Sequence, residues 1–310
     1  MNTIQLPTGL NVPVSAAYPN NWDVQQAISD IYNSFGVMTY CKPKTLRKFG
    51  ETLNADNGAD TTVAKFQGSV INETFSTTND ITHIVSDDEN DVQSLEIQGH
   101  YYDSNFRKIF TVQSVTLNGL TPVELSRSLC RVTRYKVNKV SYGNEPLDIA
   151  GNIAVYSAAG VTVTNGVVQT DAKVKLYGDT NQSRKCASSI SYYDFFVINE
   201  VSINAKKASG STALIDYDVE YREEGGVWLP MGLEGSLRTA SSNVDIIQGS
   251  PYLFIVPRNS DFRLIVNSSA DDIPVKGFVN GFLLNDITDP NSSLSVDLKN
   301  KILTSMRNPN

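Results

Sequence analysis

Apolar and polar positions alternate with a period of two through most of the chain between residues 44 and 287. The runs 215–221 and 262–266 are the clearest examples, and the first places three carboxylates between its apolar positions. Successive side chains of a strand point to opposite faces, so this alternation predicts strands with one buried face. We therefore expect the body of the protein to consist of β-sheets.

Four Asn-Gly dipeptides interrupt these runs. Asparagine and glycine tolerate the positive φ angles of a type I′ turn, so such a pair between alternating runs predicts a hairpin. Hairpins favour antiparallel sheets, and the turn-rich stretch 141–151 indicates a boundary. The predicted fold class is all-β, with two antiparallel β-sandwich (jelly-roll-like) domains at 44–145 and 146–287. The dipeptides begin at Asn57, Asn118, Asn165 and Asn280.

Helical spacing of apolar residues occurs only toward the two ends of the chain. It predicts a helix in an N-terminal arm, 1–43, where Asn21 can cap the helix and Gly36 can end it. It also predicts a helical C-terminal tail, 288–310. The apolar stripe of each helix must be covered, either by its own domain or by a neighbouring subunit. The candidate subunit-contact residues on these stripes are Ile28, Ile31, Phe35, Leu294, Leu298 and Ile302.

Charge and residue usage argue against several functions. The net charge is −7, whereas phosphate contacts need clustered lysine and arginine, so nucleic-acid binding is not expected. Two histidines and three widely spaced cysteines argue against zinc binding and histidine or cysteine catalysis. No nucleotide-binding or nucleophile motif is present, although the paired carboxylates of a glycosidase would leave no sequence signature. We expect no enzymatic activity, no catalytic residue, no metal and no cofactor.

The N-terminal sequence lacks the cationic and apolar regions of a secretory signal, and no run approaches the roughly 18 apolar residues of a membrane helix. We expect a soluble protein made in a cytosol, without membrane contacts. Cys41, Cys130 and Cys186 are then expected to be buried, reduced thiols.

Several polar clusters allow two interpretations. The acidic run 86–91 is either a calcium loop or a solvated loop, and it lacks the glycine and terminal glutamate of an EF-hand. The carboxylates in 215–221 either pair with arginines of a partner or form a wet outer face. The basic cluster 42–48 is either a solvated linker or an arm on an acidic neighbour. His83 and His100 have no partner at metal spacing, which favours structural roles.

Tyrosine is abundant, with 14 residues against 2 tryptophans. Tyrosine rings stack on sugars, so the doublets Tyr101-Tyr102 and Tyr192-Tyr193 are candidates for glycan binding. In a strand, adjacent residues point to opposite faces, so one ring of each doublet is expected in the core and the other outside.

The order of several segments resembles that of a group of tailed-phage virion structural proteins common among marine phages and cyanophages. The similarity covers roughly residues 45–285 and rests on order and spacing, since no single segment is diagnostic. One departure is His100, where the group tends to have an acidic residue. The matching segments are LRKFG (46–50), SLEIQGHYYDSNFRKIFTVQSVTLNG (94–119), SLCRVTRYKVNKVSYG (128–143), DIAGNIAV (148–155), GGVWLPMGL (225–233) and IVPRNSDFRLIVNSSADDIPVKGFVNGFLL (255–284).

The resemblance implies a virion structural protein, assembled in the host cytoplasm and located on the capsid exterior or at the tail. A surface facing packaged DNA would gain from positive charge, so the acidic chain fits an outer surface better. We expect a capsid decoration (cement) protein that bridges shell subunits. Its partners would be the major capsid protein and copies of itself, as a trimer. The alternative is a tail-, neck- or fibre-associated protein, structural or binding host glycans through exposed tyrosines.

Overall fold

The computed structural model describes residues 2–5, 11–14, 44–55, 57–64, 75–138, 149–169, 183, 185–205, 212–239 and 244–285. Within these ranges every regular element is a β-strand, and all ladders between named strands are antiparallel, as the alternating pattern predicts. Both predicted helices, with all six candidate contact residues, lie outside the described residues. In the described part of the arm, the strands β1 (Asn2–Gln5) and β2 (Asn11–Val14) pair as a hairpin. No helix that could cross a membrane is found among the described residues.

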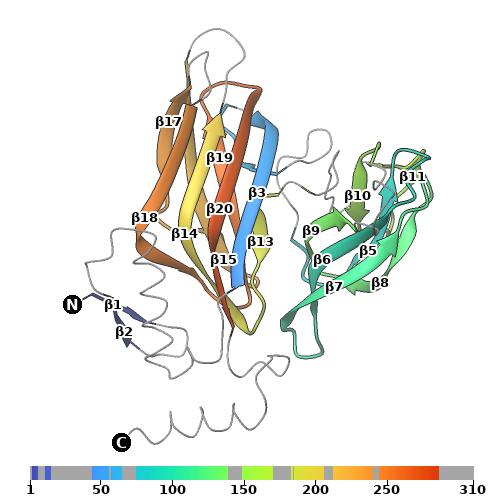
Figure 1. Ribbon diagram of the computed structural model, residues 1–310, viewed down its shortest axis with the longest axis horizontal. Helices are drawn as coiled ribbons and strands as arrows, with labels where there is room; N and C mark the ends of the chain where they lie inside the picture. Colours follow the sequence, from blue (N-terminus) through green and yellow to red (C-terminus); the bar gives the residue numbers. More distant parts are fainter. Residues whose placement is uncertain are drawn as a thin grey trace, which may run out of the picture.

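The larger domain is a sandwich of two antiparallel sheets (Figure 1). One sheet has the order β18 (Val244–Val256), β14 (Asp194–Ala205), β20 (Ile273–Asn285) and β3 (Lys44–Ala55). The other has the order β13 (Ala187–Ser189), β19 (Ser260–Ser268), β15 (Ala213–Glu223) and β16 (Leu229–Pro230). In this second sheet β17 (Gly235–Thr239) also pairs with β15, and β4 (Thr61–Thr62) pairs with β19.

The core of the larger domain lies between these sheets. Phe196 from β14 and Phe262 from β19 stack with their ring centroids 5.0 Å apart, and both are fully buried. At Gly50 of β3, an added Cβ would lie 1.9 Å from the Val63 carbonyl oxygen. The chain segments therefore approach here to a distance that only a residue without a side chain allows.

The smaller domain packs two three-stranded sheets around its own core of buried aliphatic residues and Tyr135. One sheet has the order β7 (Lys108–Thr116), β6 (Ser94–Tyr102) and β9 (Arg131–Val137). The other has the order β10 (Ile153–Tyr156), β5 (Ile81–Ser86) and β8 (Val123–Leu129). A short hairpin of β11 (Val163–Thr164) and β12 (Val167–Val168) follows.

Three of the four Asn-Gly pairs occupy turns. Asn165 and Gly166 have φ angles of 49° and 74°, as a type I′ turn requires, and they join β11 to β12. The fourth prediction is wrong, because Asn280 and Gly281 lie inside β20. An added Cβ at Gly281 would meet the Val197 carbonyl oxygen at 2.0 Å, so this glycine serves close strand packing and not a turn.

The division of the chain between the two domains differs from the predicted boundaries, 44–145 and 146–287. β3 pairs with β20 from Lys44–Leu283 to Ala55–Ile273, so the first long strand belongs to the larger domain. β10, which follows residue 146, pairs with β5 of the smaller domain. The smaller domain is thus inserted between β4 and β13 of the larger one. Periodicity identifies strands, but it carries no information about which distant strands pair.

Candidate functional site: a buried ionic junction

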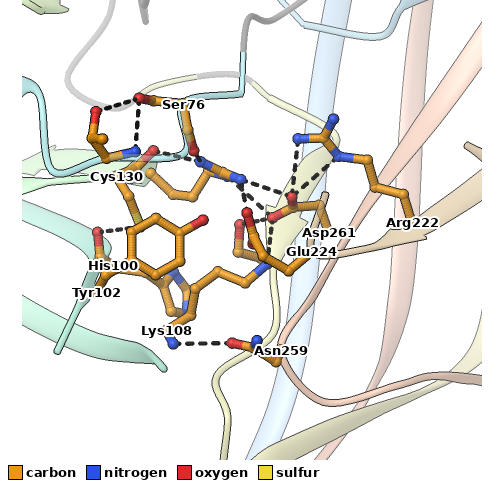
Figure 2. A network of polar contacts seen from close by, with 12 residues as sticks. Ser76, His100, Tyr102, Lys108, Cys130, Arg222, Glu224, Asn259 and Asp261 are labelled. Atoms are coloured by element: carbon orange, nitrogen blue, oxygen red, sulfur yellow. Dashed lines mark hydrogen bonds and ion pairs between the residues drawn. The ribbon is translucent and has the colours of Figure 1, made fainter. Parts of the chain in front are cut away.

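A group of charged side chains lies buried where the two domains meet (Figure 2). Lys108 on β7 and Arg131 on β9 come from the smaller domain, and Asp261 on β19 comes from the larger one. The Lys108 and Asp261 side chains are 0% exposed and that of Arg131 is 2% exposed. Because charges buried at this depth require partners, the geometry of this group determines what the junction does.

Strand register brings the cations of the smaller domain to one face. Tyr102 of β6 lies opposite Lys108 of β7, and His100 of β6 lies opposite both Phe110 of β7 and Arg131 of β9. Cross-strand partners place their side chains on the same face of a sheet. Lys108 and Arg131 consequently extend from the same face toward Asp261 of the larger domain. Tyr102 and His100 lie beside Lys108 (Figure 2).

Asp261 is the anion on which these cations converge. Arg131 donates from Nε to Oδ1 at 3.1 Å and from Nη2 to Oδ2 at 3.0 Å, a paired geometry that matches guanidinium to carboxylate. The Lys108 ammonium donates to Oδ1 at 3.1 Å, and the Ser189 hydroxyl donates to the same oxygen. Arg222 of β15 donates to Oδ2 at 3.3 Å. Both carboxylate oxygens are thus fully engaged.

Glu224 is the second anion at the junction. Its Oε2 atom lies 3.1 Å from the Lys108 ammonium and 3.8 Å from Nη2 of Arg131, and its side chain is 26% exposed. The junction therefore combines three cations with two carboxylates, all but Arg222 and Glu224 closed to solvent. Arg131 also donates from Nη1 to the backbone carbonyls of Ser76 and Cys130, which engages both N–H groups of that nitrogen.

The pKa values of the buried groups follow from this environment. Burial alone would raise the pKa of Asp261, but Arg131 and Lys108 outweigh it and hold that pKa well below its usual range. Burial, followed by the nearby Lys108, lowers the pKa of His100 from 6.5 to about 3. Burial raises the pKa of the Cys130 thiol to about 12. At neutral pH the junction therefore holds an ionised Asp261, a neutral His100 and an unreactive thiol.

Lysines of the larger domain also hold the free edge of β9. Lys48 of β3 donates from Nζ to the Thr133 carbonyl at 3.1 Å, and Lys185 donates to the Val132 carbonyl at 3.0 Å. Ser183 donates its N–H to the Tyr135 carbonyl at 3.0 Å. Edge carbonyls that would otherwise lack a strand partner are thereby satisfied across the junction.

An arginine–aromatic stack leads from the junction to the surface. The Arg222 guanidinium lies 4.3 Å from the ring centroid of Phe75 and 4.9 Å from that of Trp228. Arg263 lies 4.2 Å from the Trp228 ring and donates to Glu220 at 2.8 Å. Because guanidinium groups cover the Trp228 ring in this way, its faces do not form an open stacking platform.

The ion pairs of the junction hold the two domains in one orientation, and they leave Asp261 without access to a substrate. A general base must reach a substrate, and a nucleophile needs an activating neighbour. Asp261 is instead closed off by cations, and the thiols of Cys130 and Cys186 are buried with raised pKa values. Within the described residues, no group of three or more histidine, cysteine or acidic residues could hold a metal ion. The expectation of buried free thiols is confirmed for these two cysteines, and Cys41 lies outside the described residues.

The acidic run 86–91 is an internally bonded loop. The Asp91 carboxylate accepts the Ser86 hydroxyl and the backbone N–H groups of Ala150 and Gly151 at 2.9 and 3.0 Å. Asp87 accepts both the backbone and the side-chain N–H of Asn152. These carboxylates therefore hold the segment before β10 against the loop after β5. The solvated-loop interpretation missed this role.

We expect calcium and chelators to leave the stability of this loop unchanged, because both oxygens of Asp91 and of Asp87 already accept hydrogen bonds from N–H and O–H donors. Thermal unfolding followed by circular dichroism, with calcium and with EDTA, measures this. An increase in Tm on adding calcium that EDTA reverses would show that the loop binds the ion.

The three carboxylates of 215–221 do lie on an outer face. Asp216 and Asp218 line a hollow of about 370 Å³, together with Asp60, Glu234 and uncharged neighbours. Burial raises the pKa of Asp218 to about 6, with Glu220 and Glu234 acting in the same direction. Glu220 instead pairs with Arg263 of the neighbouring strand β19, within the same chain. The carboxylates of this face thus divide between an internal ion pair and an acidic hollow.

The remaining predicted residues have mixed outcomes. Tyr102 is 8% exposed and Tyr101 is half-buried beneath Arg127, so the first doublet divides between core and surface as predicted. Tyr192 and Tyr193 lie in a turn, and both are half-buried, so the second prediction is wrong. The linker interpretation of the basic cluster 42–48 is wrong from Lys44 onward, since β3 begins at Lys44 and the Lys48 side chain is buried. Lys42 lies outside the described residues.

The histidines have structural positions in agreement with the prediction. His100 is buried against Phe110, with ring centroids 5.5 Å apart, and His83 is half-buried near Tyr156. Sequence reasoning did not identify the Lys108–Arg131–Asp261 junction. The sequence held no local signal for it, because Asp261 lies at the polar position of an alternating run, beside the core residue Phe262 of β19, as a surface charge would.

Comparisons with known proteins do not assign the chain to a family. No protein-family profile and no curated protein sequence matches it. A tandem CBM22 domain of Paenibacillus barcinonensis Xyn10C aligns over 76% of this chain and 93% of its own, with 10% identity and a TM-score of 0.20. The infectious bursal disease virus Gx strain structure aligns over 81% of this chain and 72% of its own, with 10% identity and a TM-score of 0.20. Overlaps this small do not define a shared fold.

Proposed function

We propose that the chain is a non-enzymatic structural protein of a tailed-phage virion, most specifically a capsid decoration protein. The buried ionic junction is the observation that carries this proposal. Two domains fixed in one orientation form a rigid body that can bridge neighbouring shell subunits without a further cost of ordering the domains relative to each other. The order of sequence segments supports the same class, and the negative net charge suits an outer surface.

The proposed partners are the major capsid protein and further copies of this chain, without nucleic acid or membrane. The candidate contact residues are the apolar stripes of the two chain ends: Ile28, Ile31, Phe35, Leu294, Leu298 and Ile302. An interface of roughly 1,600 Å² in total is sufficient for stable attachment.

Deleting residues 1–40 should abolish binding to the capsid and leave the two-domain body folded, because the larger domain is described from β3 onward. Co-sedimentation of the purified protein with capsids that lack it measures binding, and circular dichroism confirms the fold. Undiminished co-sedimentation of the deleted chain would exclude the N-terminal arm as the attachment element.

The tail-associated, glycan-binding alternative depended on exposed tyrosines. No tyrosine whose side chain the structure describes is exposed, and guanidinium groups lie over the rings of Tyr101 and Tyr192. These observations argue against glycan binding through the described tyrosines, and they do not bear on a structural role at the tail or neck. Specific binding of the purified protein on a glycan array would support the alternative.

A further inference from the structure

The tip of the β6–β7 hairpin presents an exposed aromatic ring in an unfavourable backbone conformation. Phe106 is 76% exposed and has a φ angle of 58°. Its N–H donates to the Asp103 carbonyl at 3.1 Å, and the Asp103 carboxylate accepts the N–H groups of Asn105 and Arg107. In such short hairpin loops, the residue with positive φ is ordinarily glycine. Phenylalanine here neither favours the turn nor buries its ring within the chain.

The surroundings of Phe106 have the composition of an interaction surface. The Arg107 guanidinium lies 4.8 Å from the Tyr192 ring centroid and donates to the Tyr193 hydroxyl at 3.0 Å. Arg258 lies 5.3 Å from the same Tyr192 ring. Tyrosine and arginine are the residues that most often contribute the energy of protein interfaces. We call these five residues the aromatic–arginine tip.

The tip carries positive charge on an acidic chain. Among the described residues, no ion pair joins a carboxylate to Arg107, whose guanidinium lies over the Tyr192 ring and donates to the Tyr193 hydroxyl. Apolar surface beside an uncompensated cation fits a partner surface that is concave, acidic and partly apolar.

The acidic hollow of the larger domain has this character. Asp60, Asp216, Asp218 and Glu234 line its volume of about 370 Å³, with Ile265 and Tyr217 among its apolar walls and no lysine or arginine in its lining. The hollow lies on β15 away from the junction, since Asp216 precedes Arg222 by six residues, or about 20 Å of strand. The tip, by contrast, adjoins the junction through Lys108.

We propose that the aromatic–arginine tip of one copy docks into the acidic hollow of a second copy. Phe106 would enter the hollow, and Arg107 would pair with the carboxylates around it. The two surfaces differ, so the contact is heterologous and leads to a closed ring or an open chain of copies. The contact is a property of the isolated protein and does not depend on the proposed virion role.

Sedimentation velocity of the full-length protein over a range of concentrations tests the proposal. We expect concentration-dependent assembly that weakens at high salt. Phe106→Gly should weaken assembly at least tenfold while keeping or raising Tm, because glycine suits the positive φ angle. Val92→Gly, at another exposed apolar position, is the matched control and should assemble as the wild type does.

A mixing experiment identifies the two surfaces. Arg107→Glu and Asp216→Arg should each fail to assemble alone. An equal mixture should regain assembly, because the intact tip of Asp216→Arg meets the intact hollow of Arg107→Glu and the exchanged charge pair forms at the other contact. A wild-type protein that is monomeric at all concentrations would overturn the proposal. So would assembly that Phe106→Gly leaves intact, or a mixture that does not recover, because either places the contact elsewhere.

Discussion

Replacing Asp261 with asparagine should lower the free energy of unfolding by about 3–5 kcal/mol. The substitution keeps the size of the side chain but removes the charge that Lys108 and Arg131 share in the buried junction. Two cations would then remain buried with only the partly exposed Glu224 as a counter-ion. Urea unfolding followed by circular dichroism measures the change. Because both domains contribute to the junction, we expect them to lose stability together.

Asp271→Asn is the matched control for this prediction. Asp271 is exposed, and its side chain accepts the Asn57 N–H at 3.0 Å, a bond that an amide oxygen can keep, so this change should stay within about 0.5 kcal/mol of the wild type. The pH dependence has a defined sign. The pKa of Asp261 is lowered in the folded state, so its stabilisation is present above the unfolded pKa and is lost as the pH falls toward the folded value. A free energy of unfolding for Asp261→Asn close to that of the control would show that Asp261 does not hold the domains together.

His100 should make the protein sensitive to mild acid. Its pKa is about 3 in the folded state and about 6.5 in the unfolded chain, so the unfolded state binds a proton that the folded state excludes. The stabilisation is complete above pH 6.5 and decreases as the pH falls from 6.5 to 3. At pH 4 the expected loss from this group is on the order of 3 kcal/mol. The neighbouring Lys108, Lys48 and Arg131 oppose protonation, and Asp261 favours it.

His100→Gln should remove this part of the pH dependence, because the amide does not titrate. The measurement is the free energy of unfolding from urea titrations at pH 7, 6, 5 and 4 for the wild type, His100→Gln and the control His83→Gln. Parallel profiles for wild type and His100→Gln would contradict the buried, neutral state of His100.

The sequence predicted the local structure of this protein better than its long-range connections. Alternation in residues 215–221 predicted β15 and the outward direction of its carboxylates, because strand period is a property of neighbouring residues. Asn165 and Gly166 predicted their turn for the same reason. Asn280 and Gly281 do not form a turn, because an Asn-Gly pair whose glycine allows close strand packing has the same sequence as an Asn-Gly pair in a turn.

The junction lay beyond sequence reasoning for a physical reason. Arg131 and Asp261 are 130 positions apart, and their contact depends on the insertion of the smaller domain between β4 and β13. Each residue alone resembles a surface charge on a strand. The pairing of β19 with β13 and β15, and of β9 with β6, brings the charges to one buried point. Since Asp261 lies at a polar position of its alternating run, the pattern itself does not indicate the site.

The copy number of this protein in purified virions tests the proposed function most directly. Quantitative mass spectrometry against the major shell subunit gives the ratio. A decoration protein that bridges shell subunits should be present at a near-stoichiometric ratio to that subunit. A few copies per particle would contradict the decoration role and favour the tail or neck, and complete absence from the virion would contradict a structural role in the particle.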